Sequence, residues 1–366
     1  MSAPLSDLYL DIQKKWAEAA HARFIEDESQ NTEFQSFLQK EILKLNPLTV
    51  QERLSREFFE WGPLHELIEN EALTEILVNA PNSIWYEKGG ILYQHHDSFL
   101  SESSYANILE RISQKSGAHL SLNHPYLEGK FLDFRVTLVD KCLTSKYAAL
   151  SLRRHPRTAW DFNRLAENKW CTEHQAETLK ALIQDKKNFL IIGETGSGKT
   201  SIANACLQML SSSERAVLIE DCSELILPND CSLKLLTRED PYGQLTHVAQ
   251  QDLIRRSLRL RPDRLVMGEI RSTEAKDFLM MLSTGHAGSF GTLHAQSPHE
   301  ALIRLEMLVQ LGAPQWNLSA IRRLIFLSLH FILVTERNSR GERRFKGLYK
   351  LASLEDSGFT LEPVED

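Results

Sequence analysis

The sequence predicts an α/β fold, with a largely parallel sheet in its C-terminal half and a smaller α+β domain ahead of it. Three patterns support this prediction. An apolar run over 189–192 leads into a glycine-rich loop and then a helix, as a buried parallel strand does. After that loop, expected strands and helices alternate as far as residue 293. Before residue 155 the chain shows short strands broken by turns, and residues 1–55 show helical periodicity.

The composition is that of an ordinary globular protein long enough for two domains. The chain has 366 residues, of which 42% are hydrophobic and 25% charged. Its net charge of −7 argues against a protein that mainly coats nucleic acid. The five cysteines include no C-x-x-C pair, which suits a reducing cytoplasm and excludes a disulfide framework or zinc module.

The ends and the apolar runs of the chain bear on where it works. The first residues contain neither the basic nor the apolar region of a secretory signal. The most apolar stretch, Leu324 to Val334, is too short to span a bilayer. We therefore expect a cytoplasmic protein that can still work against a membrane.

The first 172 residues divide into three predicted regions. In residues 1–55, Leu5, Leu8, Ile12 and Trp16 recur at helical spacing, which predicts a small helical bundle. Residues 56–155 are expected to form the α+β domain, with a helix at 103–115 and strands at 75–79, 84–86, 91–93, 131–139 and 148–152. Residues 156–172 are interpreted as a linker.

Residues 173–350 are predicted to form a RecA-like domain. Strands are expected at 189–192, 216–220, 265–269, 289–293, 331–335 and 343–350. Helices are expected at 173–184, 201–210, 250–260, 274–282, 298–311 and 318–329. Residues 351–366 are interpreted as an acidic tail.

The loop after the first of these strands matches the phosphate-binding pattern G-x-x-x-x-G-K-[ST]. It comprises Gly193, Glu194, Thr195, Gly196, Ser197, Gly198, Lys199 and Thr200, and Ser201 begins the helix. Glycines let successive N–H groups point at one phosphate chain at the positive end of that helix. Lys199 would reach the β- and γ-phosphates, and the Thr200 hydroxyl would hold Mg²⁺. The chain is therefore expected to bind a nucleoside triphosphate.

Carboxylates follow two later strands, at the edge where a parallel sheet presents its ligands. Glu220, Asp221 and Glu224 could hold Mg²⁺ through water or orient the attacking water, although such residues also form solvated loops. Glu269 ends the strand in the Walker B place, where Gly268 replaces the usual aspartate. We expect Glu269 to polarise water against the γ-phosphate and to share in the metal shell.

Two further clusters have both functional and structural interpretations. His286 and His294 lie among glycines, at a spacing that fits no local metal site, so a γ-phosphate sensor is the preferred interpretation over core histidines. Arginines gather between residues 255 and 264. They could be a solvated helix face, or they could cross a subunit boundary to the transferring phosphoryl group.

Four segments in order resemble the type II/IV secretion ATPase superfamily, and within it the CpaF/TadA branch that powers Tad/Flp-type pilus assembly. They are GETGSGKT, IEDCSEL, LRLRPDRLVMGEIRSTEA and STGHAGSFGTLHA. Upstream, Gly62-Pro63-Leu64 and the segment 74–79 match the opening of the family's N-terminal domain, so the resemblance covers roughly residues 55–350.

The resemblance implies a homo-hexameric ring in which a PAS-like N-terminal domain clamps ATP against the RecA-like domain. The catalytic group it implies comprises Glu269, Lys199, Glu220, Glu224 and His294, and the Mg²⁺ ligands Thr200, Glu269 and Asp221. Outside the loop, the nucleotide contacts it implies are Arg135, Arg153, Arg238, Arg271 and His286. The chain departs from the family pattern at Gly117–His119, before Arg135, at Ser272 and at Gln296.

The resemblance implies an ATPase that is peripheral to a bacterial inner membrane and acts on a platform protein there. Its expected work is assembly or retraction of a Tad/Flp-type pilus, with no nucleic acid as partner. Type IV secretion of protein or DNA is the alternative. Two further alternatives are a RecA-like nucleic-acid motor and a scaffold that binds nucleotide without hydrolysing it.

Overall fold

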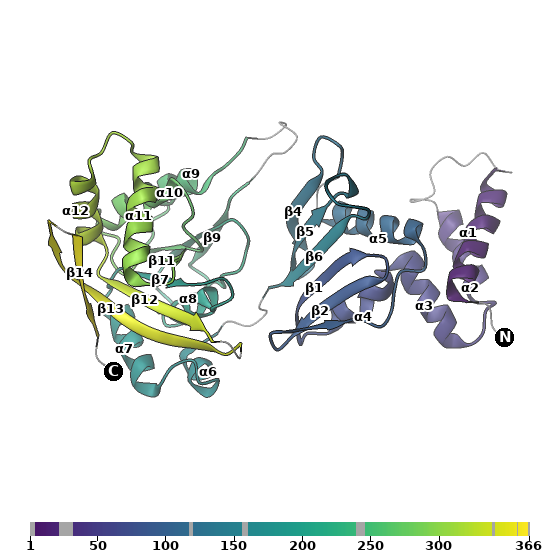
Figure 1. Cartoon of the computed structure of the whole chain (residues 1–366), viewed down its shortest axis with the longest axis horizontal. Coiled ribbons are helices and arrows are strands. Elements are labelled where there is room, and N and C mark those ends of the chain that lie inside the picture. The colour runs from purple at the N-terminus through teal and green to yellow at the C-terminus, as the bar shows by residue number, and fades with distance from the viewer. Residues whose placement is uncertain are drawn as a thin grey trace. The chain divides into compact units, whose positions relative to one another are not determined.

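A computed structural model describes residues 4–21, 32–116, 120–155, 160–238, 246–338, 341–356 and 358–364. Contacts divide the chain into two compact units, Met1–His155 and Pro156–Asp366 (Figure 1), which are described one at a time. The departure expected at Gly117–His119 lies outside the described residues.

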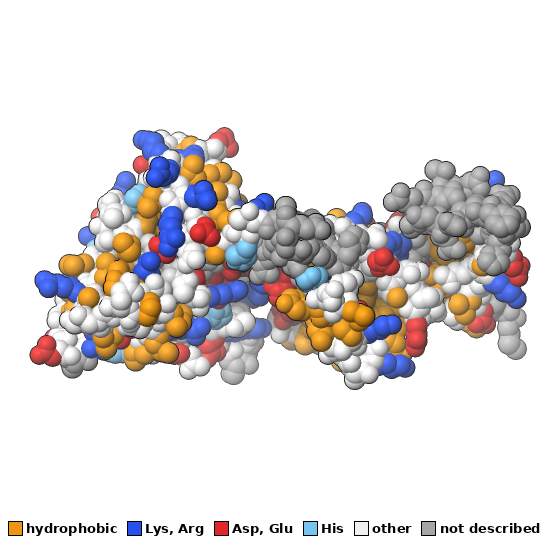
Figure 2. Space-filling view, turned by 90° about the horizontal axis from the view of Figure 1, so that it is seen from above, with side chains coloured by type: hydrophobic (Ala, Val, Ile, Leu, Met, Phe, Trp, Pro, Cys, Tyr) orange, Lys and Arg blue, Asp and Glu red, His pale blue; other side chains and the backbone are white. Residues whose placement is uncertain are grey.

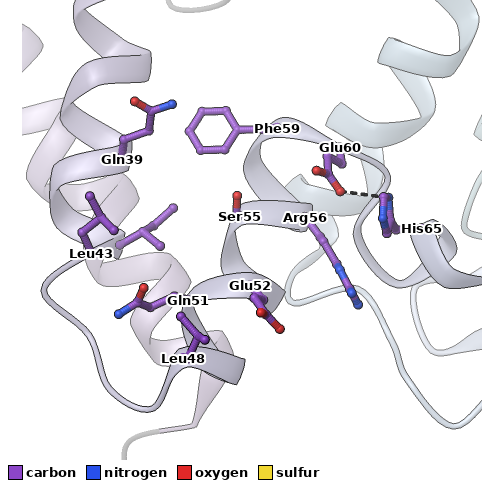
Figure 3. A pocket seen from close by; sticks show the side chains of 11 residues that line it. Gln39, Leu43, Leu48, Gln51, Glu52, Ser55, Arg56, Phe59, Glu60 and His65 are labelled. Carbon is purple, nitrogen blue, oxygen red and sulfur yellow. Dashed lines mark ion pairs between the residues drawn. The ribbon is translucent and has the colours of Figure 1, made fainter.

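The first unit begins with three helices, α1 (Leu5–His21), α2 (Thr32–Ile42) and α3 (Leu48–Phe59). Their apolar faces share a core that includes Ile12, Leu38 and Leu54. A surface hollow of about 550 Å³ lies beside α2 and α3, where His65 pairs with Glu60 at 2.8 Å (Figure 3).

A buried polar cluster connects α3 to the rest of the first unit. The predicted boundary at residue 55 falls inside this helix. The Glu57 carboxylate is 2% exposed and pairs with Arg53 at 2.5 Å. It also accepts the backbone N–H of Leu100 at 2.9 Å and the Ser104 hydroxyl. Because a buried carboxylate is costly without such partners, these contacts fix α3 in place.

The PAS-like part of this unit is an antiparallel sheet with the order β3-β2-β1-β6-β5-β4. Its strands are β1 (Leu73–Ala80), β2 (Ser83–Lys88), β3 (Ile91–Gln94), β4 (Tyr126–Phe131), β5 (Phe134–Val139) and β6 (Ala149–Arg154). Its helices are η1 (Gly62–Leu64), α4 (His65–Glu69), α5 (Glu102–Lys115) and η2 (Lys141–Leu143). Apolar residues of α5, such as Ile108 and Ile112, join the core formed by one face of the sheet.

One predicted strand of this sheet is wrong. The sequence indicated a single strand over 131–139, but the chain turns there and forms the β4–β5 hairpin. Leu132 takes a φ of 53° in the turn, which an apolar side chain rarely adopts and which the apolar pattern therefore did not reveal.

The second unit is a sheet with helices on both faces, which confirms the predicted α/β class. The strand order is β14-β13-β12-β7-β11-β10-β8-β9, and all strands from β12 to β9 are parallel. The strands are β7 (Phe189–Gly193), β8 (Ala216–Glu220), β9 (Leu233–Leu236), β10 (Arg264–Met267), β11 (Phe290–His294), β12 (Phe331–Arg337), β13 (Arg343–Glu355) and β14 (Gly358–Pro363).

Two hydrophobic clusters cover the two faces of this sheet. Leu190 and Ile192 belong to one cluster, and Phe189 and Ile191 to the other, as alternation along a strand requires. The first cluster includes residues of α9 (Gln250–Ser257), α10 (Glu274–Leu282), α11 (Pro298–Gly312) and α12 (Leu318–Ser328). The second includes residues of α6 (Phe162–Glu167), α7 (Glu173–Gln184) and α8 (Lys199–Leu207).

The described residues of the expected linker and of the expected acidic tail include regular elements of this unit. The expected linker 156–172 contains α6, whose Phe162 and Leu165 are buried against the sheet's helices. The expected tail 351–366 contributes the end of β13 and the edge strand β14. Charge content suggested a tail, but backbone pairing with β13 orders β14 although most of its side chains are not buried.

Hydrophobic side chains lie exposed among charged ones on the surfaces of both units (Figure 2). On α11, Ile303, Met307 and Leu311 recur four residues apart and are all exposed. In the part of the chain that the structure describes, no helix combines the length and the apolar character needed to cross a membrane.

Candidate nucleotide-binding site

The glycine-rich loop connects β7 to α8 at the carboxyl edge of the parallel sheet, as predicted. Gly196 and Gly198 take φ values of 75° and 98°, in the left-handed region that favours glycine. Gly198 is the N-cap of α8, so the first N–H groups of the helix follow directly from the loop. Such a helix start attracts phosphate groups.

The Lys199 side chain lies beneath this loop and is 7% exposed. Its ammonium donates to the backbone oxygens of Gly193 and Glu194, each at 2.9 Å. It also lies 3.3 Å from Nδ1 of His294. Because an ammonium can only donate, Nδ1 accepts here and the ring proton lies on Nε2.

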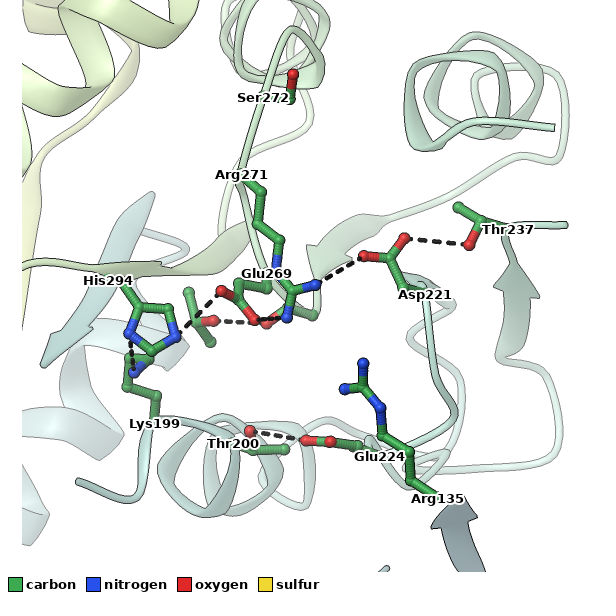
Figure 4. A network of polar contacts seen from close by, with 12 residues as sticks. Arg135, Lys199, Thr200, Asp221, Glu224, Thr237, Glu269, Arg271, Ser272 and His294 are labelled. Carbon is green, nitrogen blue, oxygen red and sulfur yellow. Dashed lines mark hydrogen bonds and ion pairs between the residues drawn. The ribbon is translucent and has the colours of Figure 1, made fainter. Parts of the chain in front are cut away.

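A line of charged groups continues from His294 across the ends of β11, β10 and β8 (Figure 4). Nε2 of His294 lies 3.1 Å from Oε1 of Glu269, and Arg271 donates to the other oxygen of Glu269 at 2.5 Å. The same guanidinium lies 3.6 Å from Asp221, which accepts the Thr237 hydroxyl at 3.1 Å. We call Lys199, His294, Glu269, Arg271 and Asp221 the charge relay.

The relay sets the protonation of its members. Burial raises the pKa of the Glu269 carboxyl, but the hydrogen bond and charge of Arg271, with His294 and Lys199, outweigh it and hold the pKa below its ordinary value. Burial and the Lys199 charge lower the pKa of His294 despite the nearby Glu269. At neutral pH the site therefore holds an ionised Glu269 beside a neutral imidazole.

The expected metal ligands have a more scattered arrangement. The Thr200 hydroxyl donates to the Glu224 carboxylate at 3.3 Å, whereas Asp221 and Glu269 face Arg271. Within the described ranges, no three His, Cys, Asp or Glu side chains converge on a metal position. Thr200 and Glu224 supply the oxygen donors that suit Mg²⁺, which keeps several waters and takes substrate phosphates as ligands.

Glu220 is buried at the end of β8 and shapes the loop that carries Asp221 and Glu224. Its Oε1 accepts the backbone N–H groups of Glu224 and Leu225 at 2.9 and 2.8 Å. Burial raises its pKa from 4.5 to about 7, although those N–H groups and Lys234 act in the opposite direction. A Cβ at Gly268 would lie 2.8 Å from Glu220 Cγ, which explains why glycine stands in the usual place of an aspartate.

His286 lies away from the other predicted site residues, and its contact with a nucleotide stays a prediction. It precedes β11, whereas His294 ends that strand at the carboxyl edge beside the loop. At about 3.3 Å per residue, the strand carries the chain from one edge of the sheet to the other. The His286 backbone oxygen accepts the Ser289 hydroxyl at 2.8 Å, a turn contact.

Besides Arg271, the arginines that the resemblance implies fall into two places. Arg135 and Arg153 lie opposite each other on β5 and β6 of the first unit, and Arg135 pairs with Glu128 at 3.2 Å. Arg238 directly follows Thr237, whose hydroxyl contacts Asp221 at the edge of the site. It donates to the backbone oxygen of Thr246 at 2.9 Å. Their contacts with nucleotide stay predictions.

Arg264 is not part of a solvated face. It is 2% exposed, pairs with Glu214 at 2.7 Å and donates to the backbone oxygens of Gly288 and Ile183. This arginine therefore joins the start of β10 to the end of α7 and to the turn before β11, at the sheet edge opposite the loop.

The arrangement is that of a phosphate-binding loop after β7 with an ionised carboxylate after β10, two strands away in the sheet. A family model described as type II/IV secretion system protein matches residues 58–333. The chain belongs to the type II/IV secretion system protein family.

Named relatives and a solved structure add detail to the family assignment. A protein of Mycobacterium tuberculosis, provisionally named a conjugal transfer protein, is 30% identical over 309 residues, 82% of this chain and 87% of that protein. The type IV secretion system protein PtlH of Bordetella pertussis is 28% identical over 320 residues, 78% of this chain and 92% of that protein. The solved structure of the Legionella pneumophila ATPase DotB, 16% identical, shares the fold with a TM-score of 0.57 over 90% of this chain and 84% of that chain. None of these singles out the CpaF/TadA branch.

This secretion-family site also depends on residues that the sequence analysis missed. The Thr335 hydroxyl of β12 lies 2.7 Å from that of Ser197, and Arg343 of β13 donates to the backbone oxygen of Gly196 at 3.0 Å. The Trp170 ring fills the space beside Gly198. All three are far from the loop in sequence, and no local pattern marks them.

Proposed function

We propose that this chain is an ATPase that powers type IV secretion, moving protein or DNA across a bacterial envelope. The observation that carries the proposal is the contact of Lys199 with His294 and of His294 with Glu269 beside the phosphate-binding loop. Two relatives bear names from conjugal transfer and type IV secretion, which favour this work over the pilus assembly that the sequence resemblance indicated.

In this proposal the loop N–H groups and Lys199 bind the triphosphate. Mg²⁺, when bound by Thr200, would neutralise charge on the β- and γ-phosphates. Each oxygen of the ionised Glu269 can accept one more hydrogen bond beyond those from His294 and Arg271, so it can orient the attacking water.

The relay also gives a physical route by which the phosphate is sensed. Lys199 donates to His294 and to loop oxygens, so its movement to a γ-phosphate frees Nδ1 of His294. His294 then shifts its interaction with Glu269, and hydrolysis reverses the change. A homo-hexameric ring of such subunits would convert these changes into force on an inner-membrane partner, with Arg135, Arg153 and Arg238 reaching the phosphates.

Phosphate release by the purified chain in Mg²⁺ and ATP tests the enzymatic part. We expect Lys199→Ala to lower turnover at least a hundredfold, while Lys180→Ala, a partly exposed lysine of α7 that pairs with Glu177, leaves it unchanged. Equal turnover in the two variants would contradict the proposal.

Cellular assays separate the two kinds of work. In a strain lacking the chain, Lys199→Ala should fail to restore DNA transfer or protein export. Restored transfer with missing surface pili would instead favour pilus assembly, and stimulation of hydrolysis by DNA would favour a nucleic-acid motor.

A further inference from the structure

The phosphate-binding loop is held from outside by two residues that no motif includes. The first is Trp170, which is 7% exposed. A Cβ at Gly198 would lie 2.5 Å from Cζ3 of its indole ring, so the ring lies directly against the backbone of Gly198. Gly198 is the N-cap of α8, and its position sets where the first N–H groups of that helix point.

The second residue is Arg343 of β13. Its Nε donates to the backbone oxygen of Gly196 at 3.0 Å, and its guanidinium lies 5.6 Å from the centre of the Trp170 ring. Its Cδ would also meet a Cβ at Gly198, at 3.4 Å. One side chain therefore lies against Gly196, Gly198 and Trp170.

Neighbouring contacts restrict the movement of both residues. The backbone N–H of Phe345 donates to the Trp170 oxygen at 2.6 Å, which ties β13 to the segment that carries the tryptophan. Trp160 stacks on Trp170 with ring centres 4.8 Å apart, and Arg164 lies 4.4 Å over the Trp160 ring. The result is a layered stack that ends on the loop.

We infer that Trp170 and Arg343 are positioning residues that fix Gly196 and Gly198 for binding of the triphosphate. The inference rests on the proposed function, because it assigns the two residues to the same site. They hold the loop in its left-handed turns, where its N–H groups converge, and so reduce the ordering that binding requires. Since Trp160 and Trp170 follow the boundary between the two units in sequence, the stack also ties this segment to the loop.

The inference predicts a change in affinity rather than in the chemical step. We expect Arg343→Ala to weaken Mg·ATP binding about tenfold, the loss of one charged hydrogen bond to a carbonyl. We expect kcat to stay within about twofold, because Arg343 contacts neither Glu269, which follows β10, nor His294, which ends β11. Arg343→Lys retains a cation that can reach the Gly196 oxygen and should recover much of the loss. Arg344→Ala is the matched control, since that neighbouring side chain is exposed and pairs with Glu342 at 3.0 Å.

Tryptophan fluorescence provides a readout that a merely structural role would not change. Mg·ATP should alter the emission of the wild-type chain. It should alter that of Trp316→Phe equally, because Trp316 packs against the hydrophobic cluster on the face of the sheet opposite Trp170. Trp170→Phe should lose most of this change and bind about threefold more weakly. Binding is measured independently by calorimetry, and thermal unfolding shows that each variant is folded.

The outcomes separate the inference from the proposed function. Wild-type protein that binds no Mg·ATP would overturn both. Wild-type protein that binds, with Arg343→Ala and Trp170→Phe equal to it within twofold, would overturn the inference alone. An equal loss of Mg·ATP affinity in Arg344→Ala would also overturn the inference, because the loss would then come from removing a positive charge anywhere near the loop.

Discussion

Replacing Gly268 with alanine tests how the buried Glu220 shapes the site. The new Cβ would lie 2.8 Å from Glu220 Cγ, well inside the ordinary carbon contact of about 3.5–4.0 Å. Glu220 cannot swing away easily, because its Oε1 accepts two backbone N–H groups at 2.9 and 2.8 Å. Overpacking of this kind costs about 2 kcal/mol, or about 4–8 °C in Tm for a unit of this size.

A double-mutant cycle identifies the contact responsible. Thermal unfolding of the full chain is compared for wild type, Gly268→Ala, Glu220→Ala and the double variant. The Gly268→Ala cost should fall below about 0.5 kcal/mol when Glu220 is alanine, since the nearest remaining contact is the Cβ at 3.4 Å. Gly129→Ala, where the same Cβ meets only ordinary contacts, is the control. An equal Gly268→Ala cost in both backgrounds would refute the reasoning.

Three further predictions concern Glu220, His294 and Arg264. The pKa of Glu220 is raised from 4.5 to about 7, so its contribution to the free energy of unfolding is present in full below pH 4.5 and is lost as the pH rises to about 7. Glu220→Gln should therefore flatten the dependence of Tm on pH between these values. An unchanged slope in the variant would exclude Glu220 as the cause. His294→Gln should lower kcat at least tenfold. Because the pKa of His294 is lowered, wild-type turnover should fall only below about pH 6.5. This decrease of turnover at acid pH should be absent from the variant. Arg264→Met should cost about 3 kcal/mol in calorimetric unfolding, because Glu214 loses its closer cation and is left with Lys186 at 3.6 Å. The exposed Arg259→Met should change little, and similar losses in the two variants would contradict a specific ion pair.

The sequence predicted the interior of the second unit well, because apolar periodicity and end signals coincide there. The predicted bounds of α7 and α10, 173–184 and 274–282, are confirmed to the residue. In α7 the Thr172 hydroxyl caps the N–H of Gln175, a signal that is visible in the sequence. The edge strands β9 and β14 were missed since their residues are mostly not buried and they depend on backbone pairing with neighbours.

The site was predictable as a set of motifs and unpredictable as a set of contacts. The loop, Glu269 and His294 were named because each belongs to a pattern with local spacing. Their linkage from Lys199 through His294 to Glu269 depends on the strand order β7-β11-β10, which no local signal encodes. Trp170, Arg343 and Thr335 reach the loop only through the fold, and His286 is separated from His294 because the few residues between them include the whole of β11.

The central claim is that Glu269 acts on an ATP molecule held by the loop. The most direct measurement is a pair of assays on Glu269→Gln, nucleotide affinity by calorimetry and phosphate release, with the exposed Glu177→Gln of α7 as control. We predict that Glu269→Gln binds Mg·ATP within about threefold of wild type but releases phosphate at least a hundredfold more slowly, whereas Glu177→Gln matches wild type. Phosphate release by Glu269→Gln at the wild-type rate would contradict the account.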